Sequence, residues 1–198
     1  YAPFRATDFT ASMERIFNAL KDQPGRKVLF VNWAGADPFP KLIATDPKRF
    51  GIEIASGANI LPAMVSYKQL PGMEGAAYYY FGIPKNPVNE WLVTEHQKRH
   101  NGPPDFFTAG GMAAGMAIVE ALKKTKGDTQ TDKLIATMEG MSFDTPKGEM
   151  TFRKQDHQAL QSMYHFKIKN DPALAWGVPE LVREIKPEEM DVPIRNRR

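Results

Sequence analysis

Apolar residues recur at helical spacing near the start of the chain and then give way to a short continuous apolar run. Phe9, Met13 and Phe17 share one face of a predicted helix, which Pro24 and Gly25 would end. The apolar run that follows has no polar alternation, which is typical of a strand buried on both faces of a parallel sheet. Three such strands are expected, at residues 28–31, 52–55 and 76–81.

A predicted helix lies between each pair of these strands, and the first of these helices opens at Asp37 and Pro38. The order strand, helix, strand, helix, strand requires parallel pairing with right-handed crossovers. The fold class is therefore α/β, with parallel sheets flanked by helices. Ligands of open α/β sheets bind beyond the carboxyl ends of the strands. The loop after the first strand, which presents Trp33 among small residues, is thus a candidate binding edge.

The chain changes character after Phe81. Residues 82–87 hold two prolines and a glycine, which is typical of a linker or hinge, and we expect a hinge strand there. Frequent prolines after Asn170 predict a segment that packs on the surface. Between these two regions the pattern predicts helices at 89–101, 105–124 and 131–138, a hairpin around a turn at 144–148, and a strand at 163–168.

Composition narrows the function classes. The chain has 198 residues, 42% of them hydrophobic, and no cysteine, which excludes disulfides and thiolate chemistry. The net charge of +3 is dispersed except at the basic end Arg195–Arg198, so a nucleic-acid partner is not expected. No apolar window is expected to span a membrane, and no signal peptide is recognisable. Because the chain opens on Tyr1 within an apparent strand, we expect sequence to precede it.

No catalytic motif or metal-ligand set is found. His96 and His100 have the spacing of two metal ligands on a helix, but Gln97 follows where a zinc protease needs its glutamate. The glycines between Gly110 and Gly115 lie within a predicted helix and lack the lysine of a phosphate loop, so close helix packing is the simpler interpretation. We therefore expect no enzyme activity, no metal and no cofactor.

Five sequence segments, taken in their order, make the chain resemble the type I periplasmic binding proteins of the branched-chain amino acid ABC transporter class. Leucine/isoleucine/valine-binding proteins are typical of that class. A turn of the form T-P-x-G followed by a strand ending in M-T-F-R is the most specific of these segments. The resemblance covers nearly the whole chain but only the C-terminal half of such a protein. The segments are TDFTASMERIF, VLFVNWAGAD, LPGMEGAAYYY, FFTAGGMAAGMAIVEALKKTKG and GMSFDTPKGEMTFRKQDHQALQSMYHFKIK.

The resemblance implies two α/β lobes joined by hinge strands that close on a small ligand. It assigns residues 1–80 to the later half of the second lobe and 81–88 to a hinge crossing. Residues 89–153 would be the C-terminal part of the first lobe, and 154–198 a return strand with a surface tail. This chain would then be a partial copy of the fold, and the missing N-terminal half of the same protein becomes an expected partner.

The resemblance also implies ligand contacts from both lobes. Relatives that bind α-amino acids commonly place an acidic residue near the position of Ala58, where this chain is neutral. A buried ammonium without a carboxylate is costly, so either Asp37 substitutes for that acid or the ligand lacks an amine. The candidate ligands are then an amino acid and an aromatic or other organic carboxylate. The implied contact residues are Trp33, Ala34, Gly35, Ala58, Asn59, Phe107 and Thr108.

Simpler interpretations stand beside these contacts. Trp33 could belong to the lobe surface or the core. Phe106 and Phe107 open a helix, where aromatic residues commonly pack against the entering chain. Residues 78–80 are three tyrosines, and core or hinge packing is the default for them.

The leading hypothesis is the substrate-binding component of an ABC importer, which captures a small organic solute and delivers it to a membrane permease. The resemblance implies a periplasmic location, with a signal peptide upstream of this chain. The alternatives are a ligand-sensing regulatory or receptor domain of the same fold, and an α/β enzyme whose catalytic residues lie outside this chain. The sequence leaves open whether the ligand is a branched-chain amino acid or an aromatic or other carboxylate.

Overall fold

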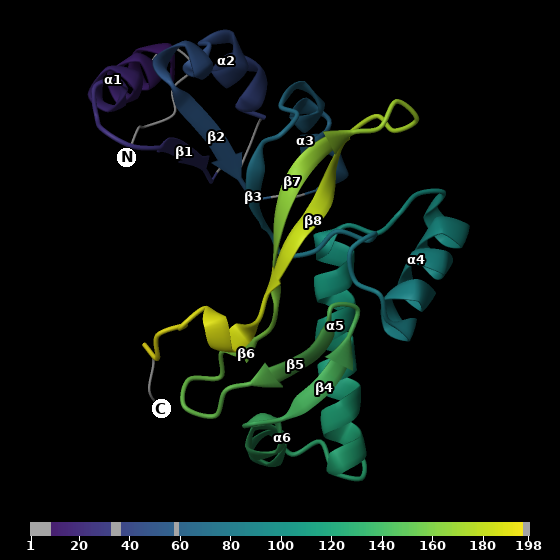
Figure 1. The fold of residues 1–198 in the computed structure, drawn as a ribbon. Helices are drawn as coiled ribbons and strands as arrows, with labels where there is room; N and C mark the ends of the chain where they lie inside the picture. The colour runs from purple at the N-terminus through teal and green to yellow at the C-terminus, as the bar shows by residue number, and fades with distance from the viewer. Residues whose placement is uncertain (1–8, 33–36, 58–59, 196–198) are drawn as a thin grey trace. The chain divides into compact units, whose positions relative to one another are not determined.

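The computed structural model describes residues 9–32, 37–57 and 60–195 (Figure 1). The chain divides into two compact units. Unit 1 comprises Tyr1–Ala76 and Phe166–Glu180, and unit 2 comprises Ala77–His165 and Leu181–Arg198. The chain therefore passes from one unit to the other at three points, after residues 76, 165 and 180.

Unit 1 alternates helices and strands, as the sequence predicts. Its strands pair in parallel, with β1 in register with β2 along their whole length and β3 joining β2 at only two positions. The α/β class and the parallel pairing are thus confirmed. The elements are α1 (Phe9–Lys21), β1 (Lys27–Val31), α2 (Phe39–Ala44), β2 (Ile52–Ser56), α3 (Leu61–Met64) and β3 (Glu74–Ala77), with 3-10 turns at Pro47–Phe50 and Ser66–Gln69.

The core of unit 1 lies between the helices and one face of β2. Phe17 of α1, Leu42 of α2 and Ile52 of β2 are fully buried. The ring of Phe39 meets Tyr67 edge-on, with the centroids 4.9 Å apart. These contacts explain why the helical periodicity of α1 is so clear, since one face of the helix carries the large apolar residues.

The burial predicted for β1 is wrong for one of its two faces. Val28 is 43% exposed and Phe30 56% exposed. They stand opposite Glu53 and Ala55 in the register, on the face of β2 that does not carry Ile52. An unbroken apolar run predicts burial on both faces only where helices cover both, and the described helices of unit 1 pack on the Ile52 face.

The third strand is shorter than predicted. It ends at Ala77, and the tyrosines that follow leave the sheet. Asn89, 3% exposed, holds this segment in place, because its side chain accepts a hydrogen bond from the Tyr79 hydroxyl at 2.7 Å and donates to the carbonyls of Phe81 and Pro84 at 3.0 and 2.9 Å. Side-chain bonding of this kind replaces the ladder that a strand would supply.

The segment expected as a hinge strand is a loop. Residues 82–86 carry no strand, and Asn86 caps the helix α4 (Pro87–His100) by accepting a hydrogen bond from the Asn89 amide at 2.9 Å. Pro84 and Pro87 lack the amide hydrogen that a ladder needs, which explains the difference. The boundary between the units lies several residues earlier, between Ala76 and Ala77. A hinge function for this part of the chain stays a prediction.

Unit 2 packs helices against a small antiparallel sheet. Ala113, Ala117 and Ala121 form the buried face of its long helix and contact Phe143 and Met150 of the sheet. Small alanines let the helix approach the strands closely. The elements are α4, α5 (Phe106–Lys124), α6 (Thr131–Met138), β4 (Ser142–Thr145), β5 (Gly148–Phe152) and β6 (Ala159–Leu160).

By length and composition alone, α5 could cross a membrane, in contrast to the expectation from the sequence. Its packing gives another reason for its apolar character. The alanine face is buried against β4 and β5, and Glu120 forms ion pairs with Lys123 and Lys124 near the end of the helix. A helix that covers a sheet needs an apolar stripe of this kind.

Two further strands complete the larger sheet, whose order is β1-β2-β3-β7-β8. The strand β7 (Met163–Asn170) is confirmed and two residues longer than predicted, whereas β8 (Gly177–Ile185) was expected as part of a surface segment. Pro179 lies inside β8, which a strand at the edge of the sheet tolerates. Arg153, which follows β5, pairs with Asp156 at 2.6 Å and donates to the Val192 carbonyl at 2.6 Å, which holds the segment after β8 against unit 2.

Candidate ligand-binding site

Five predicted site residues lie outside the described part of the chain: Trp33, Ala34, Gly35, Ala58 and Asn59. The strands that lead into their loops are described. Val31 and Ser56, the last residues of β1 and β2, are partners in the register, so both loops start at one edge of the sheet. That edge is the carboxyl edge, where ligands of parallel sheets bind. The contacts of these five residues stay a prediction.

Polar groups brace this edge of unit 1. The hydroxyl of Ser56, buried in the sheet, donates to the Val31 carbonyl at 2.9 Å and lies 3.2 Å from the Tyr67 hydroxyl. Tyr67 in turn donates to the Gly57 carbonyl at 2.8 Å. Burial raises the pKa of Tyr67, so the hydroxyl keeps its proton for these bonds. The starts of both loops are thereby fixed by the same two side chains.

Both carboxylate oxygens of Asp37 already accept hydrogen bonds within unit 1. One carboxylate oxygen accepts a hydrogen bond from the Phe39 amide at 3.0 Å, and the other accepts from the Ser66 hydroxyl. The residue is also exposed. An exposed carboxylate that already accepts hydrogen bonds from the Phe39 amide and the Ser66 hydroxyl is a poor counter-ion for a buried ammonium, because water and these donors satisfy it.

Unit 2 carries an apolar concavity that we call the aromatic hollow. It is lined by Tyr78, Phe106, Phe107, Gly110 and Gly111, has a volume of about 450 Å³ and is wide open to its surroundings. The ring of Tyr78 meets Phe106 edge-on at 6.2 Å between centroids, and Phe106 lies 4.1 Å from Phe107. A volume of this size suits a small organic molecule, and rings arranged in this way can hold a flat apolar body.

The floor of the aromatic hollow is helix backbone. A side chain at Gly111 would meet open space, and one at Gly110 would reach within 3.8 Å of the Tyr78 hydroxyl. The described part of unit 2 therefore gives these two glycines a wide opening, not the close helix packing expected from the sequence. A ring could lie directly on the turn of α5 that carries them.

The structure separates the two site residues predicted in unit 2. Phe107 lines the aromatic hollow and is 67% exposed. Thr108 does not line it, because its amide and hydroxyl both bond to the Asp105 carboxylate, at 3.1 and 3.3 Å, as part of the helix cap. The sequence reasoning missed Tyr78 and treated it as core. Its position directly after a parallel strand was the signal that could have identified it.

Lys147 lies behind the wall of the aromatic hollow. Its ammonium is 3.9 Å from the centre of the Tyr78 ring, and the residue is only 7% exposed. Burial lowers the pKa of Lys147 to about 7, and the Glu184 carboxylate opposes this effect. A lysine that changes charge near neutral pH therefore touches the back of an apolar site. The sequence offered no pattern for it beyond its place in the T-P-x-G turn.

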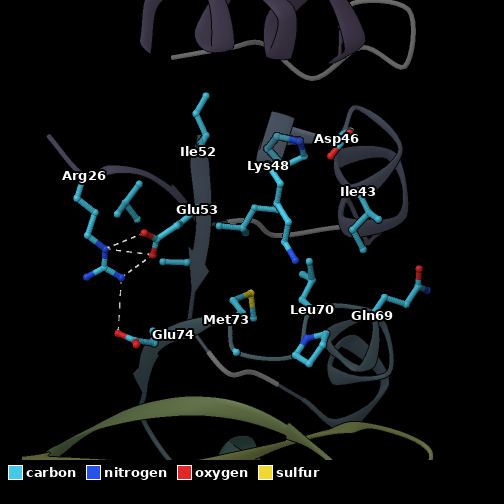
Figure 2. A pocket seen from close by; sticks show the side chains of 16 residues that line it. Arg26, Ile43, Asp46, Lys48, Ile52, Glu53, Gln69, Leu70, Met73 and Glu74 are labelled. Atoms are coloured by element: carbon cyan, nitrogen blue, oxygen red, sulfur yellow. Dashed lines mark hydrogen bonds and ion pairs between the residues drawn. The ribbon is translucent and has the colours of Figure 1, made fainter. Parts of the chain in front are cut away.

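Unit 1 contains a second cavity, of about 260 Å³ (Figure 2). Ile52, Leu70 and Met73 supply apolar walls, and Arg26 pairs with Glu53 at 2.6 Å and with Glu74 at 3.8 Å on one side. Arg26, Ile52 and Glu74 stand where their strands begin. This amino-edge cavity is thus at the edge opposite to the one where parallel sheets bind ligands.

Among the described residues, no group of three or more His, Asp or Glu side chains could hold a metal ion. His96 and His100 stack with ring centroids 4.6 Å apart, and the Nδ1 atom of His96 lies 2.7 Å from the Gly102 carbonyl. One ring nitrogen is therefore already used in holding the turn that follows α4.

Unit 1 is a parallel α/β unit, and unit 2 packs helices on an antiparallel sheet and carries the aromatic hollow. A family model described as periplasmic binding protein matches residues 1–173. The chain therefore belongs to the periplasmic binding protein family, as the resemblance indicated, in a partial copy of the type I fold.

A solved structure also places the chain among ABC transporter proteins by similarity. An ABC-type branched-chain amino acid transporter protein from Rhodopseudomonas palustris CGA009 is 67% identical, with a TM-score of 0.88 over 97% of this chain and 52% of that one. The chain thus spans about half the length of this relative. No curated protein sequence matched.

Two more distant structures share the fold. A solute-binding protein of an ABC transporter from Rhodopseudomonas palustris BisB5, in complex with 3,4-dihydroxybenzoic acid, is 22% identical with a TM-score of 0.65 over 91% of this chain and 49% of that one. A leucine-, isoleucine-, valine-, threonine- and alanine-binding protein from Brucella ovis is 15% identical, with a TM-score of 0.74 over 94% and 48%.

Proposed function

We propose that this chain is part of the substrate-binding component of an ABC importer that captures a small aromatic or other organic carboxylate. The observation that carries the proposal is the aromatic hollow, in which Tyr78, Phe106 and Phe107 surround an open stretch of helix backbone. Membership of the periplasmic binding protein family supports the transport role, the delivery to a membrane permease and the periplasmic location.

The choice of ligand class rests on charge and shape. Asp37, the one candidate for holding an ammonium that the sequence offered, is exposed and already bonded to the Phe39 amide and the Ser66 hydroxyl. An amino acid would then bring its ammonium to a site without an assigned carboxylate, which is costly if the ammonium is buried. An aromatic acid needs only a flat apolar wall for its ring and hydrogen-bond donors for its carboxylate.

Distant proteins of the same fold accommodate both ligand classes, since one is in complex with a dihydroxybenzoic acid and another is described as binding leucine, isoleucine and valine. These proteins share only the fold with this chain, so the proposed ligand class rests on the residues of the aromatic hollow. We further propose that Trp33, Ala34, Gly35, Ala58 and Asn59 contribute contacts from the loops after β1 and β2.

Thermal shift measurements on the full-length protein, meaning the natural chain that contains these 198 residues, test the proposal. The panel comprises benzoate, 4-hydroxybenzoate, two aliphatic carboxylates, leucine and valine. We expect an aromatic carboxylate to raise the melting temperature most, since a ligand that binds only the native state stabilises it. Stabilisation by leucine or valine alone would contradict the proposed ligand class while leaving the transport role intact.

A further inference from the structure

Lys147 is held in the turn that joins β4 to β5. Its amide donates to the Thr145 hydroxyl at 3.1 Å, and its carbonyl accepts a hydrogen bond from the Tyr164 hydroxyl at 3.3 Å. Gly148 follows with a φ of +100°, a conformation that glycine adopts without strain. The backbone of the turn therefore points the lysine side chain into unit 2.

The ammonium of Lys147 has a partner for each of its three N–H groups. It donates to the Gln161 side-chain oxygen at 3.0 Å and to the Ser162 carbonyl at 2.7 Å, and it faces the Tyr78 ring at 3.9 Å. Gln161 is also hydrogen-bonded to the Tyr78 hydroxyl. Lys147 is thus linked to Tyr78 in two ways: its ammonium contacts the ring face, and Gln161 bonds to both residues.

These contacts lie where the chain leaves unit 2. Tyr78 comes directly after the crossing that follows residue 76, and Ser162 comes shortly before the crossing that follows residue 165. Glu184, whose carboxylate attracts the Lys147 ammonium, follows the crossing after residue 180. A single ammonium therefore interacts with all three segments through which the chain passes between the units.

We propose that Lys147 is a positioning residue for the aromatic hollow, because its ammonium fixes the Tyr78 ring in the wall and links it to Gln161 and Ser162. The inference rests on the proposed function, since it makes the hollow the ligand site. Without the ammonium, Tyr78 keeps its place in the chain but loses the charge behind its ring and the link through Gln161. The wall is then less well ordered for a flat ligand.

The charge of Lys147 makes this positioning sensitive to pH. Burial lowers its pKa to about 7. Three other titratable groups face it. Burial raises the pKa values of Tyr78 and Tyr164, so both stay neutral. Hydrogen bonds to Ser162 and Lys186 lower the pKa of Glu184, so it stays charged. Lys147 is thus the group in this cluster that changes charge between pH 6 and 8.5, and the link to Tyr78 weakens as pH rises.

The first experiment needs no ligand. The tyrosine near-ultraviolet circular dichroism of the full-length protein is followed from pH 6 to 8.5, in wild type, in Lys147→Met and in the exposed control Lys123→Met. We expect a transition with a midpoint near pH 7 in wild type and in Lys123→Met, and none in Lys147→Met. Tyr78→Phe assigns the signal, because removing that tyrosine removes most of the change.

The second experiment measures affinity for benzoate and 4-hydroxybenzoate by calorimetry at pH 6 and 8.5. Wild type should bind at least about threefold more weakly at the higher pH. Lys147→Met should bind about tenfold more weakly than wild type at pH 6, with no pH dependence of its own, because the ligand must then order the Tyr78 wall on binding. Every other side chain is unchanged in the variant, so the difference between the two proteins isolates Lys147.

The outcomes separate the inference from the proposed function. If neither acid binds but the tyrosine transition is present and depends on Lys147, the ligand class is wrong and the positioning of Tyr78 stands. If wild type lacks the transition, or Lys147→Met keeps it, the inference is overturned whatever the ligand. If Lys147→Met does not fold, the wild-type transition and its weakening in Gln161→Met decide the question instead.

Discussion

Phe107 exposes more of its surface than any other large hydrophobic residue described here, at 67%. Helix packing does not require it, since Ala109, Ala113 and Ala117 form the buried face of α5. Its ring instead lies against Phe106 on the rim of the aromatic hollow. An exposed ring beside an apolar concavity is the arrangement expected where a ligand supplies the missing contact.

Replacing Phe107 with alanine should therefore weaken binding and spare the fold. Losing the apolar contact of one ring costs roughly 1–2 kcal/mol, or about 5- to 30-fold in affinity for the acid that stabilises the full-length protein most. Calorimetry on the variant measures the loss. Ile118→Ala, also exposed at 54% but distant from the hollow on the same helix, is the control. Equal losses in both variants would show that Phe107 acts through the helix and not through the ligand.

The second prediction at this scale concerns stability. The native pKa of Lys147, about 7, is below its ordinary value of 10.5, so between these values the unfolded state binds more protons than the native state. The contribution of Lys147 to the free energy of unfolding therefore rises with pH, by up to about 1.4 kcal/mol per pH unit. Urea unfolding at pH 7 and pH 9 should show a smaller rise in Lys147→Met than in wild type. Parallel pH profiles in the two proteins would mean that the lysine is not desolvated.

Among the elements, α5 combines a structural face with a binding face. Its alanine stripe packs on β4 and β5, while Gly110 and Gly111 lie at the floor of the aromatic hollow. A glycine within a helix weakens it, because the unfolded chain is more flexible there. Two glycines in succession near the start of α5 are therefore a cost to stability that an open binding surface would account for.

Gly111→Ala should raise stability and lower affinity at once. The added methyl meets open space, so the helix gains about 0.5–1 kcal/mol, yet the methyl enters the hollow where a ligand ring would lie. Gly115→Ala is a matched control, since it also meets open space but lies outside the hollow. Thermal melts and titrations of the two variants should agree in stability and differ in affinity. If Gly111→Ala binds as tightly as Gly115→Ala, the floor of the hollow is not in contact with ligand.

Elements with a clear period could be predicted from the sequence. The first helix and α5 follow from apolar spacing, and the parallel strands follow from their apolar runs. The extent of β3 could not be predicted. The aromatic run at Tyr78 suits a strand by propensity, but hydrogen bonds from the Asn89 side chain hold the chain in a turn. For β8, Pro179 suggested a break, and only the position of the strand at the sheet edge makes it acceptable.

The candidate site was less predictable, since it depends on contacts between distant parts of the chain. Phe107 could be singled out by resemblance, but Lys147 contacts Tyr78 across 69 positions of sequence. The pKa of a lysine and the openness of a glycine depend on what packs around them, which a single sequence does not display. Thr108 was a contact implied by the resemblance, and its role in the helix cap emerges only from the Asp105 hydrogen bonds.

At the scale of the whole molecule, the 198 residues leave large apolar side chains exposed. Val28 and Phe30 on β1, and Ile118 and Val119 on α5, are all about half exposed. The chain spans about half the length of its relative from Rhodopseudomonas palustris CGA009. Apolar patches of this kind commonly mark surfaces that further structure covers.

The isolated chain should therefore bind poorly compared with the full-length protein. We expect residues 1–198 alone to bind the hydrophobic dye ANS and to show at least about 100-fold weaker affinity for the stabilising acid, because exposed apolar surface disfavours an ordered binding site. Calorimetry and dye fluorescence on both proteins make the comparison. Full, saturable binding by the isolated chain at the affinity of the longer protein would refute this expectation.

The central claim is that the aromatic hollow of unit 2 receives the ligand. The most direct measurement is a crystal structure of the full-length protein grown with the panel compound that stabilises it most. We predict a ring packed against Tyr78 and Phe107 and lying over Gly111. A ligand found in the amino-edge cavity beside Arg26 and Met73, or one that touches none of the aromatic residues of the hollow, would contradict the account (Figure 2).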